Sequence, residues 1–476
     1  MNNPFALLSL IVILPFLGML FVFTAKDEES NNGRNAFNVC VFTILVNITL
    51  IWRIFMVINE KSRSLQLQEY FNWLTSPDIN IVFAVDTFSL ILILAVHLAI
   101  LIGLFGVVQN KFKQKSLMVF TLLFLSMATG FFISADIFSF YIFFEAMLLP
   151  LFMIIGMFGE VKKQELIYRF FLYNFIGALL LFSAVMMIYH YYGSIELAKI
   201  GSLPLKGTIR NFIWGAIFLS FVSRIPIWPF HYWISSINVS IRNPLAFIIT
   251  SLMPLTAIYG FIRFLPLKFS ADIDIYLIWM NIIGIITMVF ISLIGFINKD
   301  SQYKLFSYMT IYYIMYLLGV FCNQTNIRFN IGYSLFGFII VVSALEVMSS
   351  YIYHKEQELE TNSQGFLCRT KRLSIVYSIM LLIAIGLPFS AIFINNYLIL
   401  ANLFGTNIHI GLLLMFSVFI VGVSLLQELY RLKDKDSYCR ITKNDDISVP
   451  MFGLMLFVIF ILIMSLIKPL WFVINE

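Results

Sequence analysis

Long runs of apolar residues alternate with short polar segments along the whole chain. Each run has about twenty residues or more, enough for a helix rising 1.5 Å per residue to cross ~30 Å of hydrocarbon. The intervening polar segments are too short for separate domains, so we predict one all-α membrane domain over residues 1–476. About fourteen transmembrane helices are predicted, from the runs 5–23, 36–57, 81–108, 116–134, 136–158, 167–192, 211–234, 244–264, 274–297, 304–322, 328–352, 373–400, 406–430 and 448–473.

The ends of these runs predict an orientation in the membrane. No Lys or Arg precedes the first run, which leads directly into others, and this predicts a retained helix instead of a cleaved signal peptide. Lys and Arg gather in the connections after odd-numbered runs, as is typical of a cytoplasmic face. We therefore predict both termini on the non-cytoplasmic side, in a bacterial inner membrane in preference to a mitochondrial one. Residues 354–372 predict an amphipathic or irregular linker.

Composition agrees with this membrane assignment and excludes several other classes. The chain is 61% hydrophobic and 12% charged, whereas globular domains are roughly 25% charged. Its net charge of +6 lies mostly in connections, and no basic run is interleaved with aromatics, so no nucleic acid partner is expected. The four cysteines are dispersed, and no GxGxxG follows a strand. Neither a disulfide framework, a metal site nor a cofactor bound by this chain is predicted.

Two ionisable residues stand out because charge at membrane depth is costly and usually functional. Glu145 has apolar residues for more than two turns on each side. Arg224 precedes Pro226 and Pro229, which lack the backbone donor that a continuous helix needs. A helix broken there would expose carbonyls and admit water around Arg224. The alternative is that Arg224 snorkels near a helix end, with His231 at the interface.

A second interruption falls in the twelfth run. Gly386 and Pro388 break the apolar pattern there, and Asn396 follows, an amide that forms hydrogen bonds but does not ionise. A packing kink and a functional site explain this pattern equally well. Glu346 is a further charge within an apolar run, and its sequence context leaves both snorkelling and function open.

These residues belong to motifs that resemble the antiporter-like membrane subunits of respiratory complex I, most of all subunit M and its mitochondrial counterpart, subunit 4. Related cation/proton antiporter subunits share that fold. The resemblance extends over nearly the whole chain, through VDTFSL at 85–90, FFEAMLLPLF at 143–152, RFFLYNFIGALLL at 169–181, RIPIWPFHYW at 224–233, YGFIRF at 259–264 and KLFSYMTI at 304–311.

The resemblance implies a fold and a mechanism. In that family, two inverted five-helix repeats contain broken helices seven and twelve, and a central line of Glu and Lys relays protons. The repeats would cover approximately 116–264 and 274–430 here, and the relay would include Glu145 and Arg224. NADH, flavin, iron–sulfur clusters and quinone would belong to other parts of the complex, and other membrane subunits would be the partners.

Departures from the family pattern affect the predicted relay. Leu255 replaces a family lysine on helix eight, and Asn396 replaces a glutamate on helix twelve. Tyr313 replaces a helix-ten histidine of the family. After helix seven, SSINVSIRNP at 235–244 replaces the usual family stretch Pro-Asp-Ala-His-Val-Glu-Ala-Pro. Where the family has a relay lysine, this chain has Arg224, and an arginine with a pKa above 12 does not release its proton.

We therefore expect a locked ion pair between Arg224 and Glu145, and a diverged subunit with an incomplete charge relay. Three functions follow from the sequence. The chain supports proton movement in complex I, with Tyr, Asn and water bridging the lost charges. It is a structural or assembly paralogue without ion conduction. Or it joins a multi-subunit cation/proton antiporter.

Overall fold

The computed structural model describes residues 6–25, 34–59, 64–75, 78–109, 114–158, 163–193, 195–197, 207–264, 273–321, 327–359, 365–388, 390–433 and 446–465. Within these residues, ten helices are long and apolar enough to cross a membrane. Shorter apolar helices cover Thr208–Val222, Ile248–Phe264, Ile392–Gly405 and Val449–Met464. The predicted helical membrane fold is confirmed, whereas the total of about fourteen spans and the inverted repeats stay predictions.

The helices follow the predicted apolar runs closely. In chain order the elements are α1 (Leu7–Thr24), α2 (Arg34–Val57), β1 (Gln66–Thr75), β2 (Asp78–Val85), α3 (Thr87–Gln109), α4 (Gln114–Ile133), α5 (Ile137–Ala146), α6 (Leu148–Phe158), α7 (Lys163–Tyr192), α9 (Gly207–Val222), α10 (Tyr232–Ser240), the π-helix η2 (Ile248–Leu252), α11 (Met253–Phe264), α12 (Ile273–Ile297), α13 (Ser301–Phe321), α14 (Ile327–Leu359), α15 (Phe366–Arg369), α16 (Lys371–Ile385), α17 (Ala391–Thr406), α18 (Ile408–Lys433) and α19 (Val449–Met464).

Contacts divide the chain into two compact units. The first unit comprises Met1–His97, Lys113–Ile225 and Thr256–Tyr276, and the second comprises Leu98–Phe112, Pro226–Leu255 and Leu277–Glu476. The prediction of one domain is not tested by this division.

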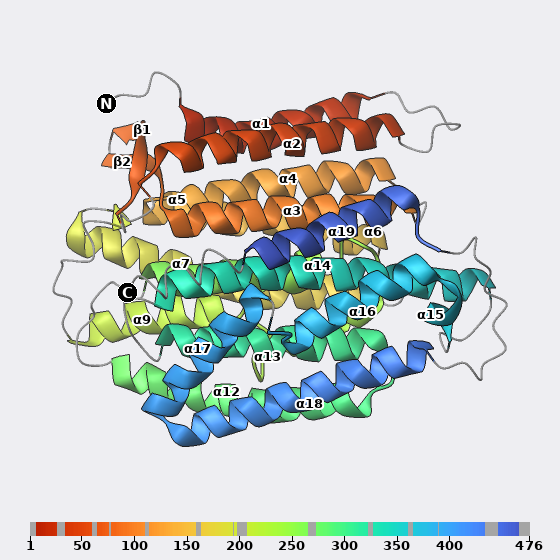
Figure 1. The fold of residues 1–476 in the computed structure, drawn as a ribbon. Coiled ribbons are helices and arrows are strands. Elements are labelled where there is room, and N and C mark those ends of the chain that lie inside the picture. The colour runs from red at the N-terminus through yellow and green to blue at the C-terminus, as the bar shows by residue number, and fades with distance from the viewer. Residues whose placement is uncertain are drawn as a thin grey trace. The chain divides into compact units, whose positions relative to one another are not determined.

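Buried polar contacts fasten the helices of the first unit. α1 packs against α2 and α4, and α1 and α2 lie side by side in Figure 1. Asn47 Nδ2 of α2 donates to Ile11 O of α1 over 3.0 Å and lies 2.9 Å from Nε2 of His97 in α3. The buried side chains of Asn47 and His97 thus form hydrogen bonds within the helical bundle, as polar groups in lipid require.

An ion pair joins the start of α3 to the end of α11 in the same unit. Both guanidinium Nη atoms of Arg263 contact the Asp86 carboxylate, at 2.8 and 2.6 Å. Tyr259 accepts a hydrogen bond from Arg263 Nε and donates one to Phe132 O. Burial of Asp86 favours its neutral form, but the charge and hydrogen bonds of Arg263, together with hydrogen bonds from Ser89, outweigh burial and lower the pKa of Asp86 below its usual value.

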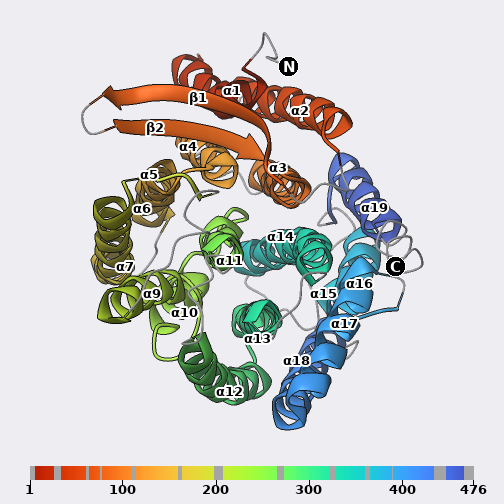
Figure 2. The same cartoon turned by 90° about the vertical axis from the view of Figure 1, so that its left-hand side faces the viewer.

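A β-hairpin precedes α3 and was not predicted. β1 and β2 pair antiparallel, as Figure 2 shows, and residues 81–85 of the predicted helical run 81–108 lie in β2. The helical prediction was wrong for these residues because a short apolar run does not by itself distinguish a strand from a helix. Val82 and Ala84 pack against Ala135, and the amide of Val82 donates to Asp136.

The second unit is built around α13 and α14, whose side chains are almost entirely buried. α13 contacts α14, α17 and α18, and Figure 2, which views the helices end-on, shows α12, α14 and α18 around it. α14 continues to Leu359, so the predicted linker 354–372 was wrong at its beginning. Lys355 and Glu358 form an (i, i+3) ion pair that favours this helical extension.

Candidate functional site

Glu145 and Arg224 lie together in the first unit. Glu145 is the penultimate residue of α5, and Arg224 follows α9 by two residues. Arg224 Nη2 donates to Glu145 Oε1 over 3.3 Å and to Phe144 O over 2.9 Å. The guanidinium also lies over the Phe144 ring. Because the arginine side chain is 1% exposed and the glutamate side chain 23%, the pair is held largely away from solvent.

Two donors of Arg224 have no hydrogen-bond partner among the described residues, namely Nε and Nη1. The cation is thus held by one carboxylate oxygen, one carbonyl and one aromatic face. A buried charge depends strongly on such a small number of partners. Glu145 is therefore the main compensating charge for Arg224.

A cavity of about 340 Å³ lies beside Glu145 in the first unit. Its wall is apolar apart from the glutamate, and its lining comprises Glu145, Leu148, Leu149, Phe152, Phe170, Phe171 and Phe175. The Glu145 side chain therefore borders an apolar cavity as well as Arg224, and no further cation lines this cavity among the described residues.

The interruption of the seventh apolar run lies where the prolines predict it. α9 ends at Val222 and α10 begins at Tyr232. Pro226 is buried, whereas Pro229 is exposed. His231 is half-buried, and its ring packs edge-on against Phe290 with centroids 5.7 Å apart. In the second unit, His231 therefore has an aromatic neighbour and no described ionic one.

The interruption of the twelfth run is equally clear. α16 ends at Ile385, and Gly386 adopts a φ of +111°, which a side chain would strain. Pro388 is exposed in the turn, and Ser390 caps α17 by accepting from the Phe393 amide. Gly386 thus ends α16, and Pro388 lies in the turn that separates α16 from α17, as is common for glycine and proline at helix ends.

Asn396 lies on α17 among hydroxyl groups of the second unit. Tyr316 Oη and Ser334 Oγ each lie 3.4 Å from its Oδ1, and Ser334 Oγ donates to Tyr316 Oη over 2.9 Å. Tyr312 also hydrogen-bonds the Asn396 side chain and donates to Ala384 O. A buried polar network therefore surrounds the position where the family resemblance implies a glutamate.

The other predicted residues of the second unit lie outside this network. The Tyr313 hydroxyl donates to the backbone oxygen of Ser251 in η2. Glu346 is 1% exposed and hydrogen-bonds the side chain of Gln302, while its Oε1 has no partner among the described residues. Since Glu346 is fully buried, snorkelling to the surface does not explain it.

The sequence did not single out a cluster of charges near the start of α13. Lys304 Nζ lies 3.3 Å from Glu428 Oε2, and both side chains are at most 5% exposed. Ser301 and Arg431 also donate to Glu428. Lys304 is the first residue of the predicted run 304–322, and the structure places it in the first turn of α13, which begins at Ser301. The available signal was an acidic residue within the apolar run 406–430.

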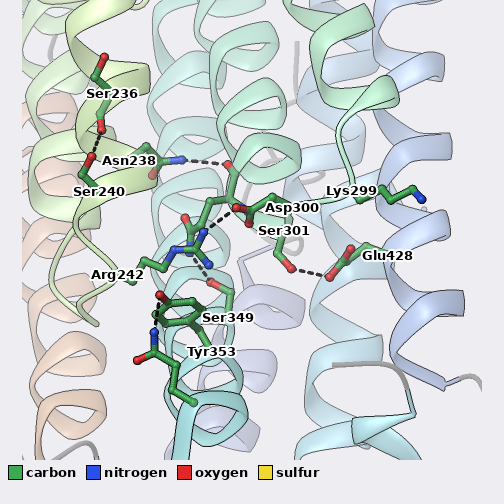
Figure 3. Close-up of polar contacts among 12 residues, drawn as sticks. Ser236, Asn238, Ser240, Arg242, Lys299, Asp300, Ser301, Ser349, Tyr353 and Glu428 are labelled. Atoms are coloured by element: carbon green, nitrogen blue, oxygen red, sulfur yellow. Dashed lines mark hydrogen bonds and ion pairs between the residues drawn. The ribbon is translucent and has the colours of Figure 1, made fainter. Parts of the chain in front are cut away.

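A second ion pair lies next to this cluster. Arg242 Nη2 contacts Asp300 Oδ2 at 2.5 Å, and its guanidinium lies over the Tyr353 ring. Figure 3 shows Asp300 directed toward Arg242 and Ser301 toward Glu428. The altered loop at 235–244 therefore contributes a charge that ties the segment before α11 to the start of α13.

Comparison with known proteins identifies the family. The sequence profile of the NADH:quinone oxidoreductase/Mrp antiporter transmembrane family matches residues 134–421, which contain both helix breaks and the Glu145–Arg224 pair. The chain belongs to this family. It is therefore an antiporter-like membrane subunit and a multi-pass membrane protein.

Curated relatives in the antiporter-like family cover most of the chain. NADH-quinone oxidoreductase subunit M of Rickettsia bellii is 26% identical over 437 residues, covering 89% of this chain and 87% of the relative. NADH-ubiquinone oxidoreductase chain 4 of Marchantia polymorpha is 26% identical over 410 residues, covering 84% and 81%. The resemblance found in the motifs is thus confirmed.

Solved structures of antiporter-like subunits share the fold. A chain of respiratory complex I from Thermus thermophilus matches with a TM-score of 0.84 and 18% identity, over 97% of this chain and 96% of that one. A chain of the Mrp complex from Dietzia sp. DQ12-45-1b matches with a TM-score of 0.80 and 16% identity, over 98% and 96%. At these identities the likeness shows the fold alone.

Within the described residues, no group of three or more His, Cys, Asp or Glu side chains could hold a metal ion. Cys40 is buried and Cys368 exposed, and both are free thiols. Leu255 is fully buried in this antiporter-like subunit. The roles of the relay positions, the missing charges and the absence of a bound cofactor stay predictions.

Proposed function

We propose that this chain is a membrane-arm subunit of a respiratory NADH:quinone oxidoreductase that supports proton movement without a redox centre of its own. The observation that carries the proposal is the buried contact between Glu145 and Arg224. It lies where the family resemblance implies a glutamate and a lysine of the proton relay. Similarity to subunit M over 89% of the chain supports this assembly over others.

In the proposed function, the Glu145–Arg224 pair is a fixed electrostatic element and not a switch. A buried lysine loses its proton readily, whereas an arginine stays charged. Arg224 therefore keeps its own charge beside Glu145 through each cycle of proton movement. The relay is incomplete at Leu255 and Asn396, so protons would cross the second unit by neutral hydroxyls or water.

The proposal includes partners and a location. Other membrane subunits of the oxidoreductase would contact this chain in the bilayer, and NADH, flavin, iron–sulfur clusters and quinone would be bound elsewhere in the complex. The bacterial relatives support a bacterial inner membrane. Both termini would lie on its non-cytoplasmic side.

The assembly is tested by purifying the tagged chain from its native membranes in mild detergent and identifying the associated subunits by mass spectrometry. Recovery with the NADH dehydrogenase core is expected. Recovery with cation/proton antiporter subunits, or of the chain alone, would contradict the respiratory assignment. An intact second copy of subunit M in the same genome would favour the structural paralogue.

Proton movement is tested by the substitution Glu145→Gln. The variant leaves Arg224 as an uncompensated cation in a medium that screens charge weakly, which opposes the passage of protons. We expect fewer protons moved per NADH oxidised, with NADH oxidation retained in uncoupled membranes. Inverted native membranes allow both quantities to be measured, by quenching of a ΔpH-sensitive dye and by NADH absorbance.

The matched control is Glu165→Gln. Glu165 lies on α7 in the same unit, and its side chain is 43% exposed and paired with Arg169. The same chemical change there should leave the proton-to-electron ratio unchanged. An unchanged ratio in Glu145→Gln, with the variant present in the complex, would count against proton movement that depends on this pair.

A further inference from the structure

One face of α13 carries an ionisable residue followed by three tyrosines at intervals of four. These residues are Lys304, Tyr308, Tyr312 and Tyr316. Side chains four apart lie above one another on a helix, so the four form a row. At 1.5 Å per residue, the row spans ~18 Å of the ~30 Å hydrocarbon thickness.

The row is enclosed within the second unit. Its residues are at most 4% exposed, and its rings follow one another with centroids 4.6 Å and then 6.4 Å apart. The Phe338 ring of α14 lies 5.6 to 5.7 Å from each of the three tyrosine rings. An apolar ring thus packs against all three tyrosine rings of the row.

Each end of the row meets a different polar group. At one end, Lys304 contacts the buried Glu428, which also accepts from Ser301 and Arg431. At the other end, Tyr316 and Tyr312 meet Asn396 on α17. The row therefore connects a titratable cation to the position on the second broken helix where the family resemblance implies a glutamate.

The hydroxyl of Tyr308 is a second observation that points to a function of the row. It is completely buried, and no hydrogen-bond partner for it lies among the described residues. A buried tyrosine normally has a partner for its hydroxyl, since leaving the group unpaired costs roughly 1–3 kcal/mol. A phenylalanine would fill the same space without that cost, so packing does not explain the oxygen.

We propose that the tyrosine row of α13 conducts protons between Lys304 and Asn396, in place of the ionisable groups missing at Leu255 and Asn396. A hydroxyl both donates and accepts. Each tyrosine oxygen accepts a proton from one side and releases its own to the next group or to a bridging water, and it stays neutral overall. Lys304 gives the first proton to Tyr308, directly or through a bridging water, and regains one from the adjoining aqueous side, while Glu428 compensates its charge. At the other end, Tyr316 releases its proton to water beside Asn396, whose amide stays neutral.

This inference rests on the proposed function and is tested in the same native inverted membranes. The main variant is Tyr308→Phe, which keeps the ring and removes an oxygen that makes no described hydrogen bond. We expect it to lower the proton-to-electron ratio as much as Glu145→Gln does. The melting temperature of the assembled complex should be unchanged or higher, because an unpaired polar group has been removed.

Tyr397→Phe is the matched control. Tyr397 lies next to Asn396 in the chain but is 63% exposed, so the loss of its hydroxyl should change nothing. Tyr312→Phe removes the middle oxygen of the row and should reproduce the effect of Tyr308→Phe. Agreement between the two variants, with normal amounts of the chain in the complex, supports conduction along the row.

The outcomes separate this inference from the proposed function. If Glu145→Gln lowers the ratio and Tyr308→Phe does not, the row is a structural feature and the inference is overturned, while the proposed function stands. If neither variant lowers the ratio in an assembled complex, both the proposed proton movement and the inference fail.

Discussion

Replacing Arg224 with methionine is expected to destabilise the protein by about 3 kcal/mol, because the Glu145 carboxylate is left without its cation. Methionine keeps the apolar contact with Phe144 but removes Nη2, which donates to both Phe144 O and Glu145 Oε1. The Glu145 carboxylate would then be 23% exposed without a cation. Thermal denaturation of the purified complex in detergent measures the loss.

The double variant Arg224→Met/Glu145→Gln distinguishes charge from packing in this prediction. Removing both charges leaves no unpaired ion, so the double variant should recover most of the lost stability. If the double variant is as unstable as Arg224→Met alone, the cost comes from lost packing and the ion pair contributes little.

Replacing Arg263 with methionine should destabilise the protein by a similar ~3 kcal/mol at neutral pH, because the bidentate partner of Asp86 is lost. The usual pKa of an aspartate is about 3.9, and in the parent protein the pKa of Asp86 is lowered below this value. The stability that this pair contributes is therefore complete above the usual pKa and is lost as the pH falls through the lowered pKa. Without Arg263, burial favours the neutral carboxyl.

The Arg263→Met variant should therefore regain part of its lost stability as the pH falls, because its buried Asp86 carboxyl then takes up a proton. Melting temperatures of variant and parent at pH 7.5 and pH 5 measure the difference, and the gap should be narrower at the lower pH. The double variant Asp86→Asn/Arg263→Met has no carboxyl to titrate and serves as the control. A gap of equal size at both pH values would contradict the assignment of the effect to the Asp86 charge.

This chain has Arg224 where the family resemblance implies a lysine, and this difference decides whether the cation of the ion pair can release a proton. Arginine presents several donors in a rigid plane, and here that plane also lies over Phe144. This geometry favours a constant charge, whereas a lysine in the same contact could discharge. In the second unit, the described residue Lys304 is a lysine buried beside Glu428, and a buried lysine loses its proton readily.

The family motifs predicted the neighbours of Glu145 but not those of Glu346 or Lys304. The sequence contains the spacing of Lys304 and the three tyrosines, yet that spacing alone does not say whether the face is buried. The position of Glu428, in another helix 124 residues away, was not accessible from the pattern. The β-hairpin before α3 was missed because its apolar run continues into the helix.

The membrane fold and the two helix breaks could be predicted from the amino-acid sequence. Hydrophobic length decides whether a segment crosses a bilayer, and Gly386, Pro226 and Pro229 act on the backbone at their own positions, so both are local properties. Which polar groups meet, such as Lys304 with Glu428 and Tyr316 with Asn396, depends on tertiary packing. These contacts join helices far apart in the chain, and they depend on which helix faces pack together.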